Sequence, residues 1–389
     1  MRRPAALFML ILLPLPALAG ILAAQAAGPA SPRWFDRITL SGLVAGEGRW
    51  LKTGSGPAAT TTTDLYLRAI EIGLEANLTD WASATVVLNS EWIGDALNNG
   101  DSGVIVDEAH IDIAVPQTRV YFVIGKRTQP FGLFETHFIT DPLIQDGYET
   151  SAVGLTMGVN APRSTDLAVT VYKGRIQSNH LAQSGLFDAN IIIPPEVTVN
   201  LVDSWIVSGL SRPAGEAWTV FAAIASEPGA GCRMTSLDAG FNLVVPGLKN
   251  LQLDAEYVQA LRREDITGLG RSFRESALSA TISYQLVVRR RAVLGGGNYR
   301  ARRSHRRSHP AELAIRFETY DDGGRAAALA SWSVRNRISF GGRYTFFEQG
   351  SVLAAVDFEY AQQMLRIAPA YEGSAGPRHE ILIRVGADF

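Results

Sequence analysis

Three ionisable side chains alternate along one short stretch of the chain and could act together. Glu108, His110 and Asp112 occupy every second position, so they would share one face of a strand. Carboxylates and an imidazole are metal ligands, but successive partners on a strand lie roughly 7 Å apart, too far for one ion. The spacing therefore predicts a charged strand face and no metal site.

The other face of the same stretch is apolar, and a second strand follows it. Ile105, Ala109 and Ile111 alternate with the charged residues, and a turn at residues 116–118 leads to a second alternating run over residues 120–127. Arg127 ends that run, and residues 128–150, here called loop three, begin a long acidic and aromatic connection. A strand pair with one apolar face and one charged face, followed by a long loop, is the repeat unit of an outer-membrane barrel.

The composition does not indicate an enzyme or a nucleic-acid-binding protein. The chain has six histidines and one cysteine, Cys232, at a net charge of −2, and it shows no nucleophile elbow, phosphate cradle or paired-carboxylate motif. A single cysteine excludes an internal disulfide, and a charge near zero does not indicate a nucleic-acid partner. We therefore expect no catalytic residue, no cofactor, no nucleic-acid partner and no enzyme activity.

The alternating pattern continues along the chain and predicts an all-β fold. It indicates a 16-stranded antiparallel transmembrane β-barrel with long extracellular loops and short periplasmic turns, formed by residues 27–389 as a single domain. Two connections depart from the rule, a short outer loop at residues 227–232 and a long arginine-rich inner one at residues 287–310. The predicted strands cover residues 38–44, 70–78, 85–91, 104–113, 120–127, 152–159, 167–172, 200–211, 218–226, 233–245, 250–261, 274–286, 311–321, 335–347, 351–361 and 378–389.

Both ends of the sequence fit export to the outer membrane. Residues 1–26 combine two arginines, an apolar core and small-residue cleavage sites after Ala19 or Ala26, which predicts a signal peptide. The last strand alternates apolar residues up to Phe389, which resembles the recognition signal read by the barrel-assembly machinery. A soluble β-sandwich or a lipid-binding barrel is the alternative for the strands alone.

The sequence of loop three and of the strand before it resembles that of a known protein family. Residues 125–142 read G-K-R-x-x-P-F-G-x-F-E-T-H-x-I-x-D-P, which resembles the strand-five and loop-three signature of the LbtU-like siderophore porins. The resemblance runs from about residue 36 to residue 389 and is densest between residues 104 and 150. It implies a bacterial outer-membrane barrel that admits ferric siderophores or similar small solutes.

The expected function is therefore an outer-membrane channel for small solutes. Alternatives are a phosphate- or other anion-type porin, and a barrel that anchors an enzyme or adhesin. Loop three either folds inward to narrow the lumen, with its acids facing Lys126 and Arg127, or lies over the mouth. The expected partners are outer-membrane lipid and a small solute or siderophore, with the barrel a monomer or a trimer. The residues expected to line the pore or its constriction are Glu91, Glu108, His110, Asp112, Lys126, Arg127, Glu135, His137 and Asp141.

Overall fold

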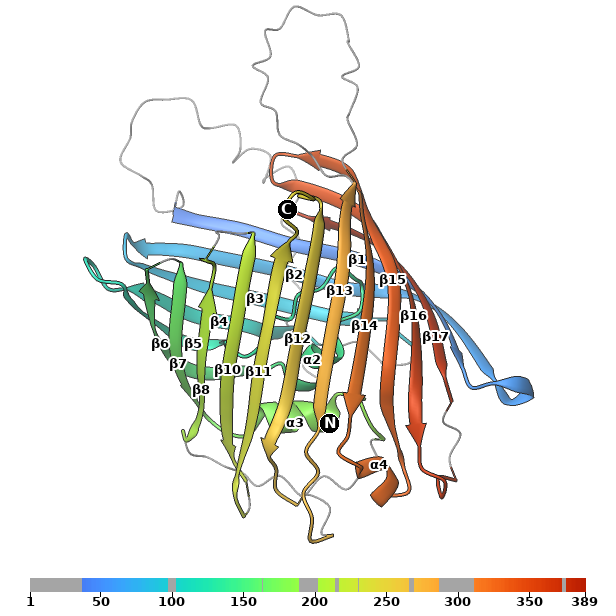
Figure 1. Ribbon diagram of the computed structural model, residues 1–389. Helices are drawn as coiled ribbons and strands as arrows, with labels where there is room; N and C mark the ends of the chain where they lie inside the picture. Colours follow the sequence, from blue (N-terminus) through green and yellow to red (C-terminus); the bar gives the residue numbers. More distant parts are fainter. Residues whose placement is uncertain are drawn as a thin grey trace, which may run out of the picture. The chain divides into compact units, whose positions relative to one another are not determined.

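Sixteen strands form a closed antiparallel barrel, as the alternating pattern predicted (Figure 1). The computed structural model describes residues 37–96, 103–162, 164–188, 202–213, 217–229, 231–265, 269–286, 311–372 and 376–389. The predicted signal peptide and the connection at residues 287–310 lie outside these residues. The strands are β1 (Ile38–Thr53), β2 (Thr60–Thr79), β3 (Ala82–Ile93), β4 (Ile105–Ala114), β5 (Val120–Thr128), β6 (Ser151–Ala161), β7 (Thr165–Tyr172), β8 (Ser204–Ser211), β10 (Trp218–Pro228), β11 (Arg233–Val244), β12 (Leu251–Arg262), β13 (Ser276–Leu286), β14 (Ala311–Asp321), β15 (Trp332–Gln349), β16 (Val352–Ile367) and β17 (Arg378–Asp388).

The barrel closes by pairing its first strand with its last. β1 and β17 are antiparallel, with a register that runs from Leu43 opposite Asp388 to Thr53 opposite Arg378. The pairing extends one residue further, because Gly42 and Phe389 exchange two backbone hydrogen bonds of 3.0 Å each. Closure leaves no free sheet edge, which is the condition for a sheet to span a bilayer.

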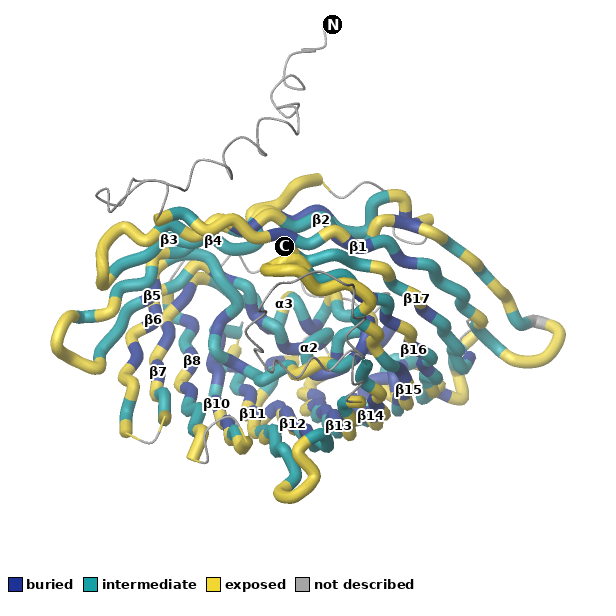
Figure 2. Tube along the Cα trace, turned by 90° about the horizontal axis from the view of Figure 1, so that it is seen from above, coloured by how far each residue is buried: buried dark blue, intermediate teal, exposed yellow. Residues whose placement is uncertain are grey.

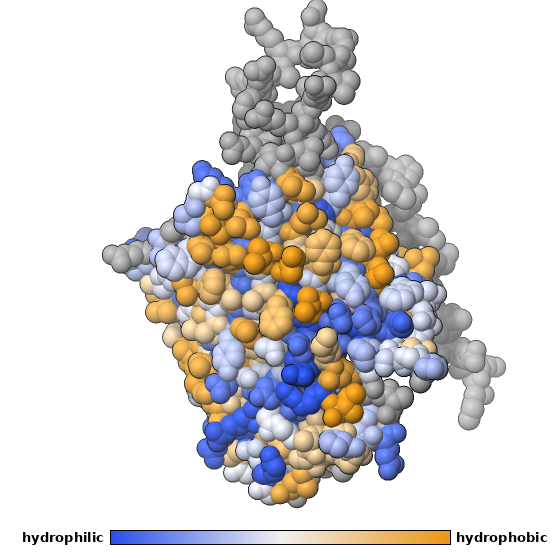
Figure 3. Space-filling view, turned by 45° about the vertical axis from the view of Figure 1, so that its right-hand side comes forward, coloured by the Kyte–Doolittle hydropathy of each residue, from blue (hydrophilic) through white to orange (hydrophobic). Residues whose placement is uncertain are grey.

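The outward face is the apolar one. Large aliphatic side chains are exposed on strands around the barrel, and Figure 3 shows hydrophobic side chains gathered over part of one such face. A closed barrel with an apolar exterior belongs in a bacterial outer membrane, and this is where the protein resides. Among the exposed residues are Ile72, Leu74, Ile111, Ile124, Leu155, Val169, Ile282, Ile315, Phe340 and Ile383.

The first hairpin is longer than the sequence pattern predicted. The first two predicted strands covered only residues 38–44 and 70–78, but β1 continues to Thr53 and β2 begins at Thr60, with a short 3-10 turn (Gly56–Ala58) between them. β-branched residues favour extended backbone, so the threonine run at residues 60–63 extends the strand. Arg49 also lies 3.5 Å from Asp64 across the hairpin, which holds the two strands together.

Two short helices lie inside the ring of strands. α2 (Leu143–Tyr148) and α3 (Ile176–Gln183) both appear within the ring in the view along the barrel in Figure 2. A third helix, α4 (Arg325–Ala328), lies in the connection between β14 and β15. α2 packs against α3 and against β12, β13 and β14, so connections that were expected only as loops fill part of the lumen.

No helix in the described ranges is long and apolar enough to cross a bilayer.

Candidate functional site

Loop three crosses the lumen and is bonded to the opposite wall. It leaves β5 and reaches β12, where the backbone N–H groups of Leu133 and Phe134 donate to the Glu256 carboxylate at 2.7 and 3.0 Å. Glu256 comes from a strand more than a hundred residues further along the chain. The inward course of loop three, one of the two arrangements left open by the sequence, is the one the structure adopts.

His137 holds the middle of loop three between two carboxylates. Its Nε2 lies 2.9 Å from Asp254 on β12, and its Nδ1 lies 2.5 Å from Glu312 on β14. Burial by itself lowers the pKa of His137, but the two carboxylates outweigh burial and raise that pKa to about 9. The imidazolium therefore links two strands of the wall through the loop at neutral pH.

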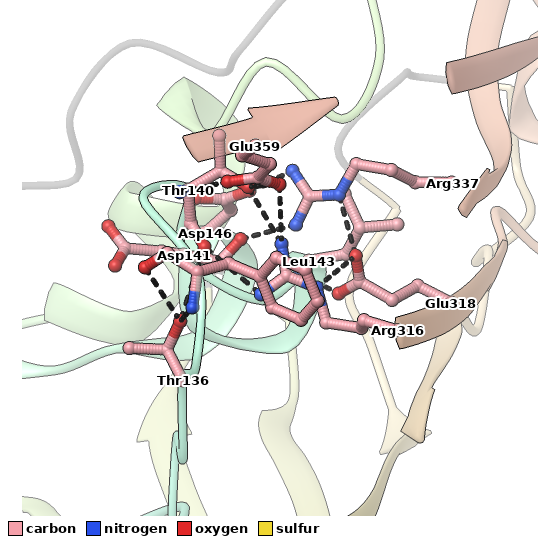
Figure 4. Close-up of polar contacts among 10 residues, drawn as sticks. Thr136, Thr140, Asp141, Leu143, Asp146, Arg316, Glu318, Arg337 and Glu359 are labelled. Carbon is pink, nitrogen blue, oxygen red and sulfur yellow. Dashed lines mark hydrogen bonds and ion pairs between the residues drawn. The ribbon is translucent and has the colours of Figure 1, made fainter. Parts of the chain in front are cut away.

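Two further carboxylates accept hydrogen bonds from the next part of loop three. The N–H and the hydroxyl of Thr140 donate to Glu359 on β16 at 2.8 and 2.7 Å. The N–H of Leu143, at the start of α2, donates to Glu318 on β14 at 2.7 Å. Figure 4 shows these contacts converging on one cluster. Charge-assisted hydrogen bonds of this kind are stronger than neutral ones, so the loop is firmly placed.

Two buried arginines complete this cluster. Arg316 donates to the Thr140 carbonyl oxygen at 3.0 Å, and its guanidinium lies 4.6 Å from the centre of the Phe138 ring. Arg337 donates to Glu318 at 2.6 Å and also to the backbone carbonyl oxygen of Asp141. Glu318 therefore faces both guanidinium groups, since Arg316 lies 3.0 Å away as well. Each buried charge has an opposite partner, which is the condition for keeping charges out of water.

The inner side of loop three is an apolar core within the barrel. Phe131, Leu143, Ile144 and Tyr148 are almost fully buried. They pack with residues from the loop after β7 and from the lumenal wall, so that side chains fill part of the lumen at this level. The partners are Tyr172, Leu181, Leu186, Phe187, Ile206, Phe221, Val258, Ala277, Tyr320 and Val334.

A second segment folds inward beside loop three. Residues 174–199 were expected to form an extracellular loop, but α3 lies inside the barrel, where Glu227 on β10 accepts the N–H groups of Gln177 and Ser178 at 2.8 and 2.9 Å. The strand-like bridge of Phe187 with Ser333 then ties the segment to β15. The buried Leu181, Leu186 and Phe187 were the available signal, but their spacing matches no regular period.

The predicted pore residues of β3 and β4 lie together on the lumenal face. His110 Nε2 is 3.2 Å from Asp112, and His110 Nδ1 is 3.9 Å from Glu108. Glu91 on β3 lies 3.1 Å from Arg68 on β2. The contacts of His110 stay within β4, whereas the Glu91–Arg68 pair joins β3 to β2 on the same wall.

The two predicted basic residues of β5 lie apart from the acids of loop three. Lys126 shares the face of the exposed Ile124 and donates to the Val106 carbonyl oxygen at 2.6 Å. Arg127 donates to the hydroxyl of Thr156 on β6 at 3.2 Å. The basic groups bonded to loop three are Arg316 and Arg337 instead.

The two predicted acids of loop three have different surroundings. Glu135 is exposed, whereas Asp141 is partly buried. Burial raises the pKa of Asp141, and the nearby Arg68 partly offsets that rise. The two acids lie on either side of His137, so the loop carries acidic groups along much of its length.

Comparison with solved structures supports a porin fold. No family model and no curated protein sequence matches this chain. The anion-selective porin from Comamonas acidovorans matches with a TM-score of 0.55 at 11% identity, over 90% of this chain and 99% of that one. OmpF of Salmonella typhi matches with 0.58 at 11%, over 90% and 97%, and OprB of Pseudomonas putida with 0.55 at 9%, over 91% and 95%. The chain therefore has the fold of bacterial outer-membrane porins, and the siderophore subfamily stays a prediction.

The prediction that the protein has no enzyme activity does not stand. The matches also include OmpT, an outer-membrane protein of Vibrio cholerae, with a TM-score of 0.50 at 9% identity, over 90% of this chain and 99% of that one. Sharing a fold with it does not exclude an activity other than transport.

Proposed function

We propose that the protein is a diffusion channel for small solutes, narrowed from within by loop three. The observation that carries this proposal is the bonding of loop three across the lumen to Glu256, Glu318 and Glu359. A loop held at several points on the far wall divides the lumen and fixes the width of what remains. Glu135, His137 and Asp141 lie on this loop, and we propose them as constriction residues.

The apolar core behind loop three supports a narrow passage. Side chains that are nearly inaccessible to water, such as Phe131 and Tyr148, exclude solutes from their part of the lumen. Burying them favours the docked loop through the hydrophobic effect, at about 25 cal/mol per Å² of apolar surface. The passage is then limited to solutes smaller than the barrel itself would admit.

Single-channel recording in planar bilayers tests this proposal. Deleting residues 133–139 removes the hydrogen bonds of loop three to Glu256 and the contacts of His137 with Asp254 and Glu312. We expect a clearly larger conductance and an altered ion preference. Heat-modifiable migration in gels establishes that the shortened barrel is folded. A folded deletion variant with unchanged conductance and selectivity would place the constriction elsewhere, and a folded wild-type barrel without conductance would refute the channel.

The resemblance at residues 125–142 supports ferric siderophores as the narrower class of solute. Uptake of a labelled ferric siderophore into proteoliposomes, compared with a sugar of similar size, tests this class directly. Growth on that iron source with and without the gene tests it in the cell. Equal uptake rates for the siderophore and the sugar would indicate a general channel without preference for siderophores. We further propose that residues 1–26 are the signal peptide of a single barrel at residues 27–389.

A further inference from the structure

The two halves of the lumenal wall differ in how far water reaches them. On β3 and β4 the side chains of Glu91, Glu108 and Asp112 are 36%, 33% and 41% exposed. On β14 and β16 the side chains of Glu318 and Glu359 are 0% exposed. These residues all face the lumen, so the contrast shows which part of the wall borders open space.

The half of the wall that water does not reach, here called the covered half, is the one against which loop three, α2 and α3 pack. Asp238 on β11, Ser279 on β13 and Ser339 on β15 are lumenal but buried. α2 touches β12, β13 and β14, and it also packs against α3. A solute that crosses at this level is therefore excluded from the side of β11–β16.

The accessible half is acidic. Glu71, Glu91, Glu108 and Asp112, here called the acidic wall, lie on the lumenal faces of β2, β3 and β4. Arg68 is paired with Glu91 at 3.1 Å. The guanidinium of Arg127 is directed to the Thr156 hydroxyl. The wall thus presents an excess of carboxylates to the open space.

Three arginines elsewhere in the lumen are already paired with carboxylates. Arg316 and Arg337 are buried with Glu318. Arg343 is accessible, but it lies 3.7 Å from Asp357 and 3.5 Å from Asp388. Each of these three arginines is therefore already in contact with at least one carboxylate.

His110 lies within the acidic wall and, in the described part of the chain, has one unpaired ring nitrogen. Its side chain is only 10% exposed, and it lies between Glu108 and Asp112. Its Nδ1 atom is buried and has no hydrogen-bond partner among the described residues. Buried polar atoms are normally satisfied, so this nitrogen is left to pair with water or with a donor that enters between the two carboxylates.

We infer that solutes pass off-centre, along the acidic wall, and that the channel prefers cations. The inference rests on the proposed channel function and adds its path and charge class. Rings and rows of carboxylates select cations in narrow pores. The exposed Glu135 of loop three adds a further negative charge within the lumen. Screening shortens the reach of these charges from about 10 Å at 0.1 M salt to about 3 Å at 1 M, so the preference weakens as salt rises.

The test measures the reversal potential of single channels under a KCl gradient. We expect potassium to permeate better than chloride in the wild type. The variant that combines Glu71→Gln, Glu91→Gln, Glu108→Gln and Asp112→Asn should move the permeability ratio towards parity. Asp321→Asn removes a carboxylate that lies outside the acidic wall, beside Arg366, and it should leave the ratio unchanged.

Two separate single-cysteine variants provide a second test if the combined variant fails to fold. In a Cys232→Ser background, a cationic thiol reagent should block current through Asp112→Cys and leave Ser279→Cys unaffected. Block of Ser279→Cys alone, or a ratio at parity in the conducting wild type, would overturn this inference and leave the channel function standing. Folded protein that conducts in no variant would instead overturn the proposed function, and this inference with it.

Discussion

The substitution Glu318→Gln tests most directly which contacts hold loop three against the barrel wall. The substitution keeps the shape of the side chain and an oxygen for the Leu143 N–H, which is 2.7 Å away. It removes the negative charge that faces Arg316 at 3.0 Å and Arg337 at 2.6 Å. Both guanidinium groups are almost fully buried, so neither can turn to water for compensation.

The structure sets the size of the effect. Removing one partner of a buried ion pair costs about 3–5 kcal/mol. Glu359 remains 3.6 Å from Arg316, and Asp146 remains 3.6 Å from Arg337, so we expect the lower end of that range. A cost of about 3 kcal/mol corresponds to an increase of about a hundredfold in the undocked fraction of loop three.

Two assays report that fraction. Single-channel traces should show frequent transitions to a larger conductance, and chymotrypsin should cleave loop three at its aromatic residues much faster than in the wild type. Asp321→Asn on the same strand is the control, since Asp321 is 65% exposed beside Arg366 and exposed pairs contribute little. If Glu318→Gln behaves like this control while the barrel stays folded, the cluster in Figure 4 does not hold the loop.

Three further predictions concern the lipid face, assembly and pH. Ile72→Arg should destabilise the barrel by about 2–4 kcal/mol if the position lies near the midplane, whereas Glu71→Ala should cost far less, and equal unfolding midpoints in urea would contradict the assigned faces. Deleting Phe389, or replacing it with a charged residue, should reduce insertion, and a normal amount of heat-modifiable barrel in the outer membrane would argue against that role. The pKa of His137 is raised to about 9, so the stabilisation that it gives to loop three is complete below its ordinary pKa of about 6.5 and is lost as the pH rises through about 9. Conductance fluctuations should therefore increase at alkaline pH in the wild type and be insensitive to that change in His137→Gln.

The strands and their facing were predictable from sequence because a strand has a short, strict period. Ile72 and Leu74 point outward, as their alternation with Glu71 predicted, and Glu108, His110 and Asp112 share the lumenal face. The inward course of loop three was one of two possibilities, which its aromatic residues favoured. Local patterns are sufficient for such features.

The contacts of the site were not predictable, because they join residues far apart in the chain. The partners of His137 lie 117 and 175 positions away, and nothing in the spacing of charges identifies Asp254 and Glu312. Lys126 lies on the outward face with Ile124, although its neighbour Arg127 is lumenal. The inward fold of α3 depends on Glu227, whose carboxylate meets the helix start only after the barrel has formed.

The seam between β1 and β17 has a consequence for the order of folding. Neighbouring hairpins such as β2 and β3 can pair as soon as both have been made, because the loop between them is short and its closure costs little entropy. The Gly42–Phe389 hydrogen bonds join residues from the two ends of the barrel sequence, so they can form only when the remaining strands are already in order. Long-range pairing of this kind slows folding. Until then, the free edges of β1 and β17 are open to pairing with other chains.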